Sequence, residues 1–325
     1  MKRWRIFWLV CCFAFPAFLW EVQAQEKYPN RSIELVTPYA PGGSGDIGAR
    51  IYSDEMAKIL NVPITVVNRP GGSGVHGTIY VIKAKKDGYI LLNGGSGAMV
   101  FVPIISKEAT FDPLRDLVPL AHFSSVPSVF DVRSDSPFKT LNELIDYARK
   151  NPDKLKNATG GPSNPSYFNF KILCVKNNIK IPTVPFDSGG EALPALLGGH
   201  VDMSCQTITT EAPHIKAGKV RGLAITSKKR HPDFPNIPTT AELGYPYVNF
   251  QVWFGVFAAT GVPQPVLNVL IPALERVFKN PEVIDKANRV NMPIEYMGPE
   301  EFRKFFESEI NIVRKIAQDA NLIKK

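Results

Sequence analysis

Residues 41–50 read P-G-G-S-G-D-I-G-A-R and come shortly after an apolar, β-branched run at 33–38. That run predicts a β-strand. Beyond the glycines, apolar residues recur from Ala49 to Ile59 at every third or fourth position, which predicts an amphipathic helix over 47–60. A buried strand that passes through a glycine-rich turn into such a helix is typical of α/β proteins. This unit therefore sets the expected fold class.

The rest of the chain repeats this alternation, and a capping box at Thr140 starts one of the expected helices. Further strands are expected at 64–67, 89–92, 128–132, 201–205, 222–226 and 252–258, and further helices at 78–85, 140–150, 191–197 and the C-terminal end of the chain. The length fits two domains at roughly 150 residues each. Since no flexible linker separates them, we expect strands to cross directly from one lobe to the other.

The N-terminal segment predicts export. Lys2, Arg3 and Arg5 precede an apolar run at 6–20, and 22–24 read V-Q-A, which resembles a signal-peptidase site. A cleaved signal peptide over 1–24 is the favoured interpretation. A membrane anchor is the alternative, but the run is short for a bilayer, which needs about 20 apolar residues.

The composition of the chain limits the classes of binding partner that can be expected. Cleavage lowers the formal net charge from +8 to +6, a mild excess that fits an anionic ligand or a solvated surface. No arginine-rich tract with interleaved aromatic residues predicts nucleic-acid binding, and no Cys/His cluster has metal-ligand spacing. The two cysteines that remain, Cys174 and Cys205, could form a disulfide or stay as buried thiols; both alternatives remain open.

The glycines at 43, 45 and 48 have the G-x-G-x-x-G spacing of a dinucleotide-binding turn, and the spacing returns at 72, 74 and 77. Such a site needs an acidic residue at the end of the second strand to bind the ribose. Here that strand is followed by Asn68-Arg69-Pro70, without an acid. A nicotinamide enzyme is therefore disfavoured, and no cofactor is predicted.

A hydrolase is also disfavoured. Residues 94–98 read G-G-S-G-A and nearly match the nucleophile elbow G-x-S-x-G, but Ala98 replaces the last glycine. The five histidines are scattered, and no segment nominates a catalytic Asp–His pair. We therefore predict no catalytic residue.

Anion binding explains the glycine-rich turns best. A glycine-rich loop before a helix exposes N–H groups at the positive end of the helix dipole, and serine hydroxyls add donors. Similar turns occur at 93–97, 159–166 and 187–190. Turns rich in donors and poor in bases suit recognition of a carboxylate without chemistry. The alternative for any single turn is a merely tight α/β connection.

An ordered set of motifs resembles the tripartite tricarboxylate transporter substrate-binding proteins, the TctC-like or Bug (Bordetella uptake gene) family. The motifs run from Y-P-N-R-S-I-E-L-V-T-P-Y-A-P-G-G-S-G-D at 28–46 through V-V-N-R-P-G-G at 66–72 and A-L-L-G-G-H-V-D at 195–202 to W-F-G-V-F-A-A-T-G-V-P at 253–263. The resemblance covers nearly the whole mature chain.

This resemblance implies a type II periplasmic-binding-protein fold of the α/β class, with two lobes joined by two crossing β-strands. Lobe 1 is expected at 25–125 plus 252–325, and lobe 2 at 126–251. It further implies a monomer, not an enzyme, that captures a small carboxylate in the periplasm by lobe closure. The carboxylate would be a dicarboxylate, a tricarboxylate, an acidic amino acid or an aromatic acid, delivered to a two-subunit membrane permease. A periplasmic sensor or adaptor is the alternative, and an exported enzyme comes third.

The resemblance also implies the binding residues. They comprise a first-lobe turn, a second turn in that lobe, and second-lobe positions: Tyr39, Ala40, Pro41, Gly42, Gly43, Ser44 and Asp46; Ser96 and Gly97; Ser163, Asn164, Ser166, Asp187, Ser188 and Gln206. Because a carboxylate is an odd partner for an anion, we expect Asp46 to accept a hydrogen bond from the turn or from a water molecule and so to orient donors toward the ligand.

Two positions depart from the family pattern. Asp187 stands where a basic residue or glycine is usual, and Gln206 where an aspartate is usual. If Asp187 faces the cleft, it favours a ligand with an amino group; if it points outward, it has no effect. Trp253, the only tryptophan left after cleavage, lies on an expected crossing strand, so ligand binding is predicted to change its fluorescence.

Overall fold

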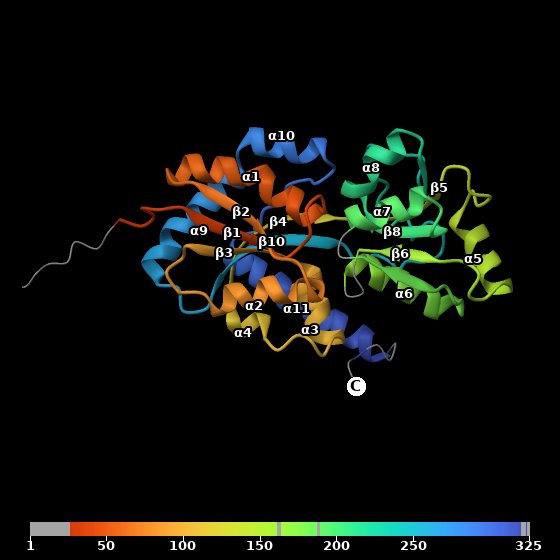
Figure 1. Ribbon diagram of the computed structural model, residues 1–325, viewed down its shortest axis with the longest axis horizontal. Helices are drawn as coiled ribbons and strands as arrows, with labels where there is room; N and C mark the ends of the chain where they lie inside the picture. Colours follow the sequence, from red (N-terminus) through yellow and green to blue (C-terminus); the bar gives the residue numbers. More distant parts are fainter. Residues whose placement is uncertain (1–26, 161–163, 187–188, 320–322, 324–325) are drawn as a thin grey trace, which may run out of the picture.

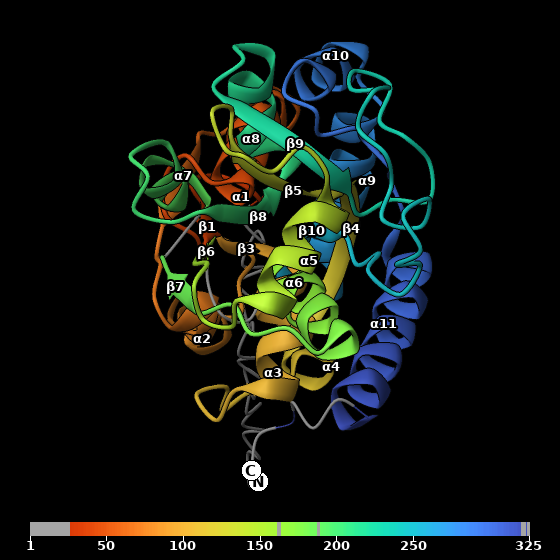
Figure 2. The ribbon, with the colours of Figure 1, turned by 90° about the vertical axis from the view of Figure 1, so that its right-hand side faces the viewer.

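The computed structural model describes residues 27–160, 164–186, 189–319 and 323, which form two lobes side by side (Figure 1). Each lobe is built on its own five-stranded sheet, with helices on both sides. Seen in two directions, α1, α7 and α8 lie on one side of the strands that connect the lobes, and α11 lies on the other (Figures 1 and 2).

The first sheet has the order β2-β1-β3-β10-β4. Its strands are β1 (Ile33–Thr37), β2 (Ile64–Asn68), β3 (Ile90–Gly95), β4 (Leu117–Val126) and β10 (Val252–Ala259). β1 pairs in parallel with β2 and β3, whereas β10 is antiparallel to both β3 and β4. The sheet is therefore mixed, and the expected α/β strands form its parallel part.

The second sheet repeats this plan in the order β7-β6-β8-β5-β9. Its strands are β5 (Ser128–Arg133), β6 (Asn157–Thr159), β7 (Thr183–Pro185), β8 (Met203–Thr207) and β9 (Val220–Ile225). β6 is parallel to β7 and β8, and β5 is antiparallel to β8 and β9. In both sheets the antiparallel fourth strand is the one that enters from the other lobe.

The chain passes between the lobes at two points. β4 of the first sheet runs into β5 of the second through Pro127 alone. The return follows a long irregular segment after β9 and ends in β10, and the Phe250 backbone is held there by both side-chain amide atoms of Asn169. We call these two crossing points, at Pro127 and at Phe250, the hinge.

Helices of the first lobe pack on both faces of its sheet: α1 (Ser44–Leu60), α2 (Val75–Lys83), α3 (Val102–Ile105), α4 (Pro113–Asp116), α9 (Gln264–Phe278), α10 (Pro281–Arg289) and α11 (Pro299–Asp319), with short turns η1 (Gly72–Gly74) and η2 (Gly97–Phe101). The helix expected at the C-terminal end of the chain is confirmed, and its residues Phe302, Phe306 and Val313 are fully buried.

The second lobe contains α5 (Leu141–Lys150), α6 (Pro165–Asn177), α7 (Gly189–Leu197) and α8 (Ile208–Lys216). The predicted capping box of α5 is confirmed: the Thr140 hydroxyl accepts from the Glu143 N–H at 3.2 Å, and the Glu143 carboxylate accepts from the Thr140 N–H at 3.3 Å. Such a box satisfies two N–H groups that helix geometry leaves without partners.

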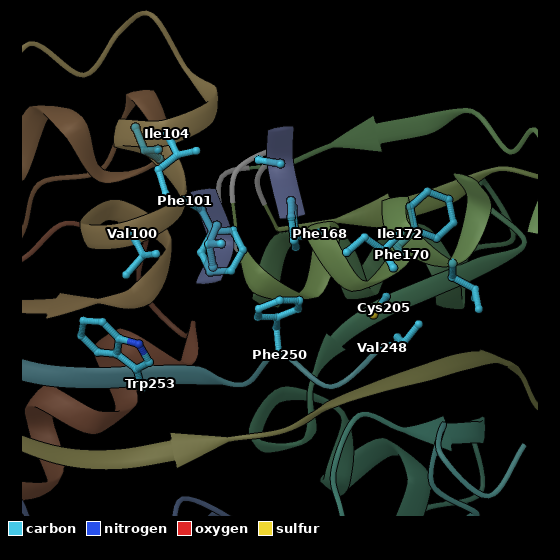
Figure 3. Close-up of a cluster of buried hydrophobic side chains, with 14 of the residues drawn as sticks. Val100, Phe101, Ile104, Phe168, Phe170, Ile172, Cys205, Val248, Phe250 and Trp253 are labelled. Carbon is cyan, nitrogen blue, oxygen red and sulfur yellow. The ribbon is translucent and has the colours of Figure 1, made fainter. Parts of the chain in front are cut away.

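An aromatic cluster joins the lobes. Phe101 of the first lobe lies 5.0 Å from Phe168 and 5.8 Å from Phe250, measured between ring centroids (Figure 3). Phe168 and Phe250 are 5.2 Å apart, and all three rings are buried. Edge-to-face rings at these separations attract one another beyond the effect of their buried area. The cluster therefore holds the lobes together beside the hinge.

The two open alternatives for the cysteines are resolved in favour of free thiols. Cys174 and Cys205 are both buried and not bonded to each other. Burial raises the pKa of Cys174 to about 12 and that of Cys205 well above its ordinary value, so both remain protonated. Among the described residues there is no helix long and apolar enough to cross a membrane, and no cluster of three metal-ligating side chains.

Candidate functional site

A cavity lies between the lobes where helix N-termini meet. From the first lobe it is lined by Tyr39, Gly43, Ser44, Gly45, Gly97, Val252 and Phe254, and from the second by Gly160, Asn164, Pro165, Ser166, Gly189, Gln206, Thr207 and Thr210. The first turns of α1, α6, α7 and α8 all contribute to this lining. Positive helix ends therefore converge on one small space.

The N-terminus of α1 is buried without a side-chain cap. Gly43 is the N-cap residue and has no side chain that could accept from the first-turn N–H groups. Ser44, Gly45 and Asp46 are nevertheless buried. The helix begins at Ser44, three residues earlier than predicted, so the glycine-rich stretch forms its first turn. First-turn N–H groups have no partner within a helix, and an anion is the natural acceptor for them.

The Asp46 side chain stabilises this turn by hydrogen bonds. Its carboxylate accepts from the Gly42 N–H at 3.0 Å, from Asn68 Nδ2 at 2.9 Å and from Arg50 Nε at 3.0 Å. Burial alone would raise the pKa of Asp46, but hydrogen bonds from Arg50, Gly42 and Asn68 together lower it below its ordinary value. The expected hydrogen bond from the turn is confirmed. Asp46 does not line the cavity, and its role in orienting donors toward a ligand stays a prediction.

The G-x-G-x-x-G spacing has a packing cause. A Cβ atom on Gly45 would lie 2.3 Å from the Tyr39 ring, and one on Gly48 would lie 3.1 Å from the Met292 sulfur. In the second cluster, a Cβ atom on Gly77 would lie 2.7 Å from the Arg69 carbonyl oxygen. These glycines let elements approach closely, which accounts for the spacing without a nucleotide.

In the second lobe the Asn164 side chain caps α6. Its Oδ1 accepts from the Tyr167 N–H at 2.8 Å, and its Nδ2 donates to the Gly160 carbonyl at 2.7 Å. The neighbouring Ser166 hydroxyl lies 2.6 Å from the Ser128 hydroxyl at the hinge. Both predicted residues line the cavity, but their side chains are already bonded within the lobe. Their contribution is to shape the wall and to present the helix end.

Threonines at the start of α8 were missed by the sequence analysis. Thr207 is the N-cap residue of α8 but forms no side-chain cap. Instead its hydroxyl lies 3.0 Å from the Ser44 hydroxyl of the first lobe and 3.2 Å from the Thr210 hydroxyl. The Ser44–Thr207 contact joins the two lobes across the cavity. A hydroxyl-rich stretch directly after a buried strand, T-I-T-T at 207–210, is the signal that could have revealed it.

The predicted site residues fall into three groups. Those that line the cavity are Tyr39, Gly43, Ser44, Gly97, Asn164, Ser166 and Gln206. Those outside the lining are Ala40, Pro41, Gly42, Asp46 and Ser96. Ser163, Asp187 and Ser188 lie outside the described residues.

Ser96 illustrates the second group. Its hydroxyl accepts from the backbone N–H of Trp253 at 3.2 Å and is fully buried, because β3 continues to Gly95 and carries it alongside its neighbour β10.

The described lining is uncharged. It includes no Lys, Arg, His, Cys, Asp or Glu among the residues that the structure describes. An anion bound there would be stabilised by backbone N–H groups, hydroxyls and helix dipoles rather than by a cation. Of the residue types that commonly serve in general acid–base catalysis, the described lining includes only Tyr39. The arrangement is therefore suited to holding an anion.

A buried carboxyl pair lies in the second lobe, and one of its members, Glu211, directly follows the cavity residue Thr210 along the chain. Asp131 of β5 and Glu211 of α8 are fully buried, and Asp131 accepts from the Ser204 hydroxyl. Burial raises the pKa of Asp131 to about 7, and burial together with the Asp131 charge raises that of Glu211 well above its ordinary value. The pair therefore retains a proton near neutral pH.

Comparison with known proteins gives consistent matches. The model of the tripartite tricarboxylate transporter family receptor, TctC, matches residues 48–322. A Pseudomonas sp. protein from the tcbD–tcbE intergenic region is 32% identical over 304 residues, covering 92% of this chain and 89% of that protein. BugT of Bordetella pertussis is 29% identical over 286 residues, which is 88% of each chain.

Solved structures agree with the fold. The periplasmic binding protein BugD superposes with a TM-score of 0.87 at 29% identity, covering 92% of this chain and 100% of that one. The structure of an R. palustris protein with adipate superposes with a TM-score of 0.86 at 26% identity, covering 90% of this chain and 98% of that one. MatC from Rhodopseudomonas palustris with bound malate gives 0.84 at 29% identity, covering 89% and 99%. The expected two-lobe fold of type II periplasmic binding proteins is confirmed.

Proposed function

The chain belongs to the tripartite tricarboxylate transporter family of receptors, and we propose that it captures a small carboxylate between its lobes in the periplasm. The observation that carries this proposal is the buried N-terminus of α1 facing the N-terminus of α8 across one cavity, neither with a side-chain cap. At α8 the first N–H group, that of Ile208, is already bonded to the Pro127 carbonyl at 3.0 Å, so α1 supplies most of the free donors. Unpaired N–H groups at a buried helix end are costly unless an acceptor binds them. A carboxylate supplies two acceptor oxygens and the charge that the helix dipoles favour.

Family relatives support the ligand class. One related structure contains malate and another contains adipate, both dicarboxylates. Because this chain lines its cavity with neutral donors, we propose a dicarboxylate, a tricarboxylate or another small acid whose charge is met by helix ends at both walls. A ligand with a second acidic group bridges the lobes, since α1 belongs to one wall and α8 to the other.

Closure is the proposed mechanism. The ligand binds first to the α1 turn, and the second lobe then swings over it about the Pro127 and Phe250 connections. Only differential affinity shifts an equilibrium, so the ligand must make contacts in the closed form that it lacks in the open form. The Thr207 hydroxyl lies 3.0 Å from the Ser44 hydroxyl of the other lobe. We propose that this contact within the protein forms only when the lobes are closed, and that the ligand then reaches Thr207 as well.

We propose lobe boundaries at 125/126 and 251/252, so that lobe 1 comprises 25–125 plus 252–325 and lobe 2 comprises 126–251. The sheets support this division, because β4 ends at Val126 and β10 begins at Val252. As a receptor of a tripartite system, the closed monomer would deliver its ligand to a membrane permease of two subunits. The signal peptide at 1–24 would direct export and then be cleaved.

A ligand screen tests the proposal. Purified mature protein is heated with a panel of C4 to C9 dicarboxylates, citrate, acidic amino acids and aromatic acids. A true ligand raises the melting temperature by mass action, and calorimetry then gives its affinity. Thr207→Val should weaken binding, whereas Ser32→Ala, an exposed change on the first lobe, should leave it unchanged. If no acid in the panel raises the melting temperature, the carboxylate assignment is wrong.

A further inference from the structure

A second cavity lies on the other side of β10 from the ligand cleft. It has a volume of about 690 Å³ and runs between α11 of the first lobe and α6 of the second. Successive residues of a strand point to opposite faces. Accordingly Val252 and Phe254 line the ligand cleft, whereas Gln251 and Trp253 line this second cavity, which we call the hinge groove. Drug-sized ligands occupy pockets of about 300–1,000 Å³.

The walls of the hinge groove are apolar and incompletely covered. Val175 of α6 is 52% exposed and Ile312 of α11 is 50% exposed, and both line the groove. Within the described part of the chain only one other large hydrophobic residue, Tyr147, is exposed. Phe250 and Trp253 are aromatic members of the same lining. Exposed apolar side chains that gather in one concavity indicate a binding surface rather than scattered exposure.

The groove also has polar lining residues, namely Ser125, Lys176, Lys228, Tyr247, Asn249, Gln251, Ser308 and Glu309. Trp253 donates its indole N–H to the carboxyl group of Glu309, which also lines the groove. Lys176 and Lys228 are exposed members of the lining, and neither takes part in an ion pair among the described residues. The groove thus combines an aromatic and aliphatic surface with two cations that have no counter-ion.

From this combination we propose that the hinge groove is a second binding site, and that its occupant is a small amphipathic anion. An aromatic or aliphatic body would pack against Phe250, Val175 and Ile312, and a single acidic group would meet Lys176 and Lys228. The occupant touches α6 of the second lobe and α11 of the first, so it bridges the lobes from the side opposite the transported ligand. This site is independent of which ligand binds the cleft.

Anilinonaphthalenesulfonate is a suitable probe, because it joins an aromatic body to one anionic group and fluoresces in apolar sites. Its binding to the mature protein is followed by its own emission and by quenching of Trp253, the only tryptophan after the predicted cleavage site. Phenylnaphthylamine, which has the same body without the sulfonate, is the matched ligand. We expect saturable binding at one site, quenching of Trp253, and weaker binding of the neutral probe.

Variants place the probe in the groove. Ile312→Glu and Val175→Glu, on opposite walls, should each abolish the quenching, and Lys176→Gln with Lys228→Gln should weaken binding roughly fivefold, the effect of two exposed ion pairs. Both apolar positions are half-exposed, so the variants should fold, as circular dichroism verifies.

Tyr147→Glu and Lys150→Gln on α5 are the matched controls and should bind like the unchanged protein. If Ile312→Glu and Val175→Glu both bind the probe like the unchanged protein, the proposed location of the site is wrong. If the neutral probe binds with the same affinity as the sulfonate, the proposed preference for an anion is wrong.

Discussion

The hydroxyl contact between Ser44 and Thr207 gives the sharpest test of lobe closure. The two oxygen atoms lie 3.0 Å apart, and both residues are more than nine-tenths buried. In an open form each hydroxyl is hydrated, so the bond contributes only to the closed form. A neutral hydrogen bond contributes about 1 kcal/mol net. That corresponds to an approximately fivefold change in the ratio of closed to open molecules.

A double-mutant cycle isolates this contribution. Ser44→Ala and Thr207→Val each remove one hydroxyl, and the double variant removes both. Each single change should lower the closed population about fivefold, and the double variant should be little worse than either. The coupling energy is therefore expected to be about 0.5–1.5 kcal/mol. Effects on other contacts of either residue cancel in the cycle.

Populations are measured without ligand by electron–electron resonance between spin labels. Exposed positions Glu282 of α10 and Lys219 beyond α8 lie on different lobes and accept introduced cysteines. The buried native thiols of Cys174 and Cys205 stay protonated and should not label. If the two single effects simply add, within about 0.3 kcal/mol, the hydroxyls do not interact and the proposed closed-form contact is refuted.

Three further outcomes are expected from urea unfolding. Asp46→Ala should lower the free energy of unfolding by about 2–3 kcal/mol at pH 7, since three hydrogen bonds end on that carboxylate. Because the folded state lowers the pKa of Asp46, the difference between the two proteins should shrink in acid. Asp46→Asn should lower the free energy of unfolding by less than Asp46→Ala. Burial raises the pKa of Asp131 to about 7, so the parent protein loses the stabilising contribution of the protonated carboxyl as pH rises through that value. The free energy of unfolding of Asp131→Asn should therefore increase relative to that of the parent as pH rises from about 4 to 8. Parallel pH curves for the two proteins would contradict this. Phe101→Ala should lower the free energy of unfolding by about 3–5 kcal/mol because the ring is fully buried between the lobes. Ile312→Ala, the control, should lower it much less. Equal decreases would show that the aromatic cluster does not hold the lobes together.

Local pattern predicted the elements that carry their own signal. The strands at 33–38, 64–67 and 252–258 are rich in β-branched, aliphatic or aromatic residues, and each occurs within a residue or two of its predicted bounds. β4 was not predicted, although it is almost entirely buried, because Pro119, His122 and two serines interrupt its apolar pattern. The three-residue strands β6 and β7 are too short to show any period.

The sequence by itself determined the α/β class and the family resemblance, and it predicted an export signal and an anion-binding turn at Gly43 and Ser44. These depend on neighbours in the chain, because a helix start leaves its first N–H groups unpaired whatever surrounds it. Only the tertiary structure decided which helix starts face one another, since that depends on strand order and on how the lobes pack. It brought Thr207 to Ser44 from a distant part of the chain and bonded the Ser96 hydroxyl to the backbone of β10. It also left Val175 and Ile312 uncovered on two different lobes, a juxtaposition that no local pattern contains.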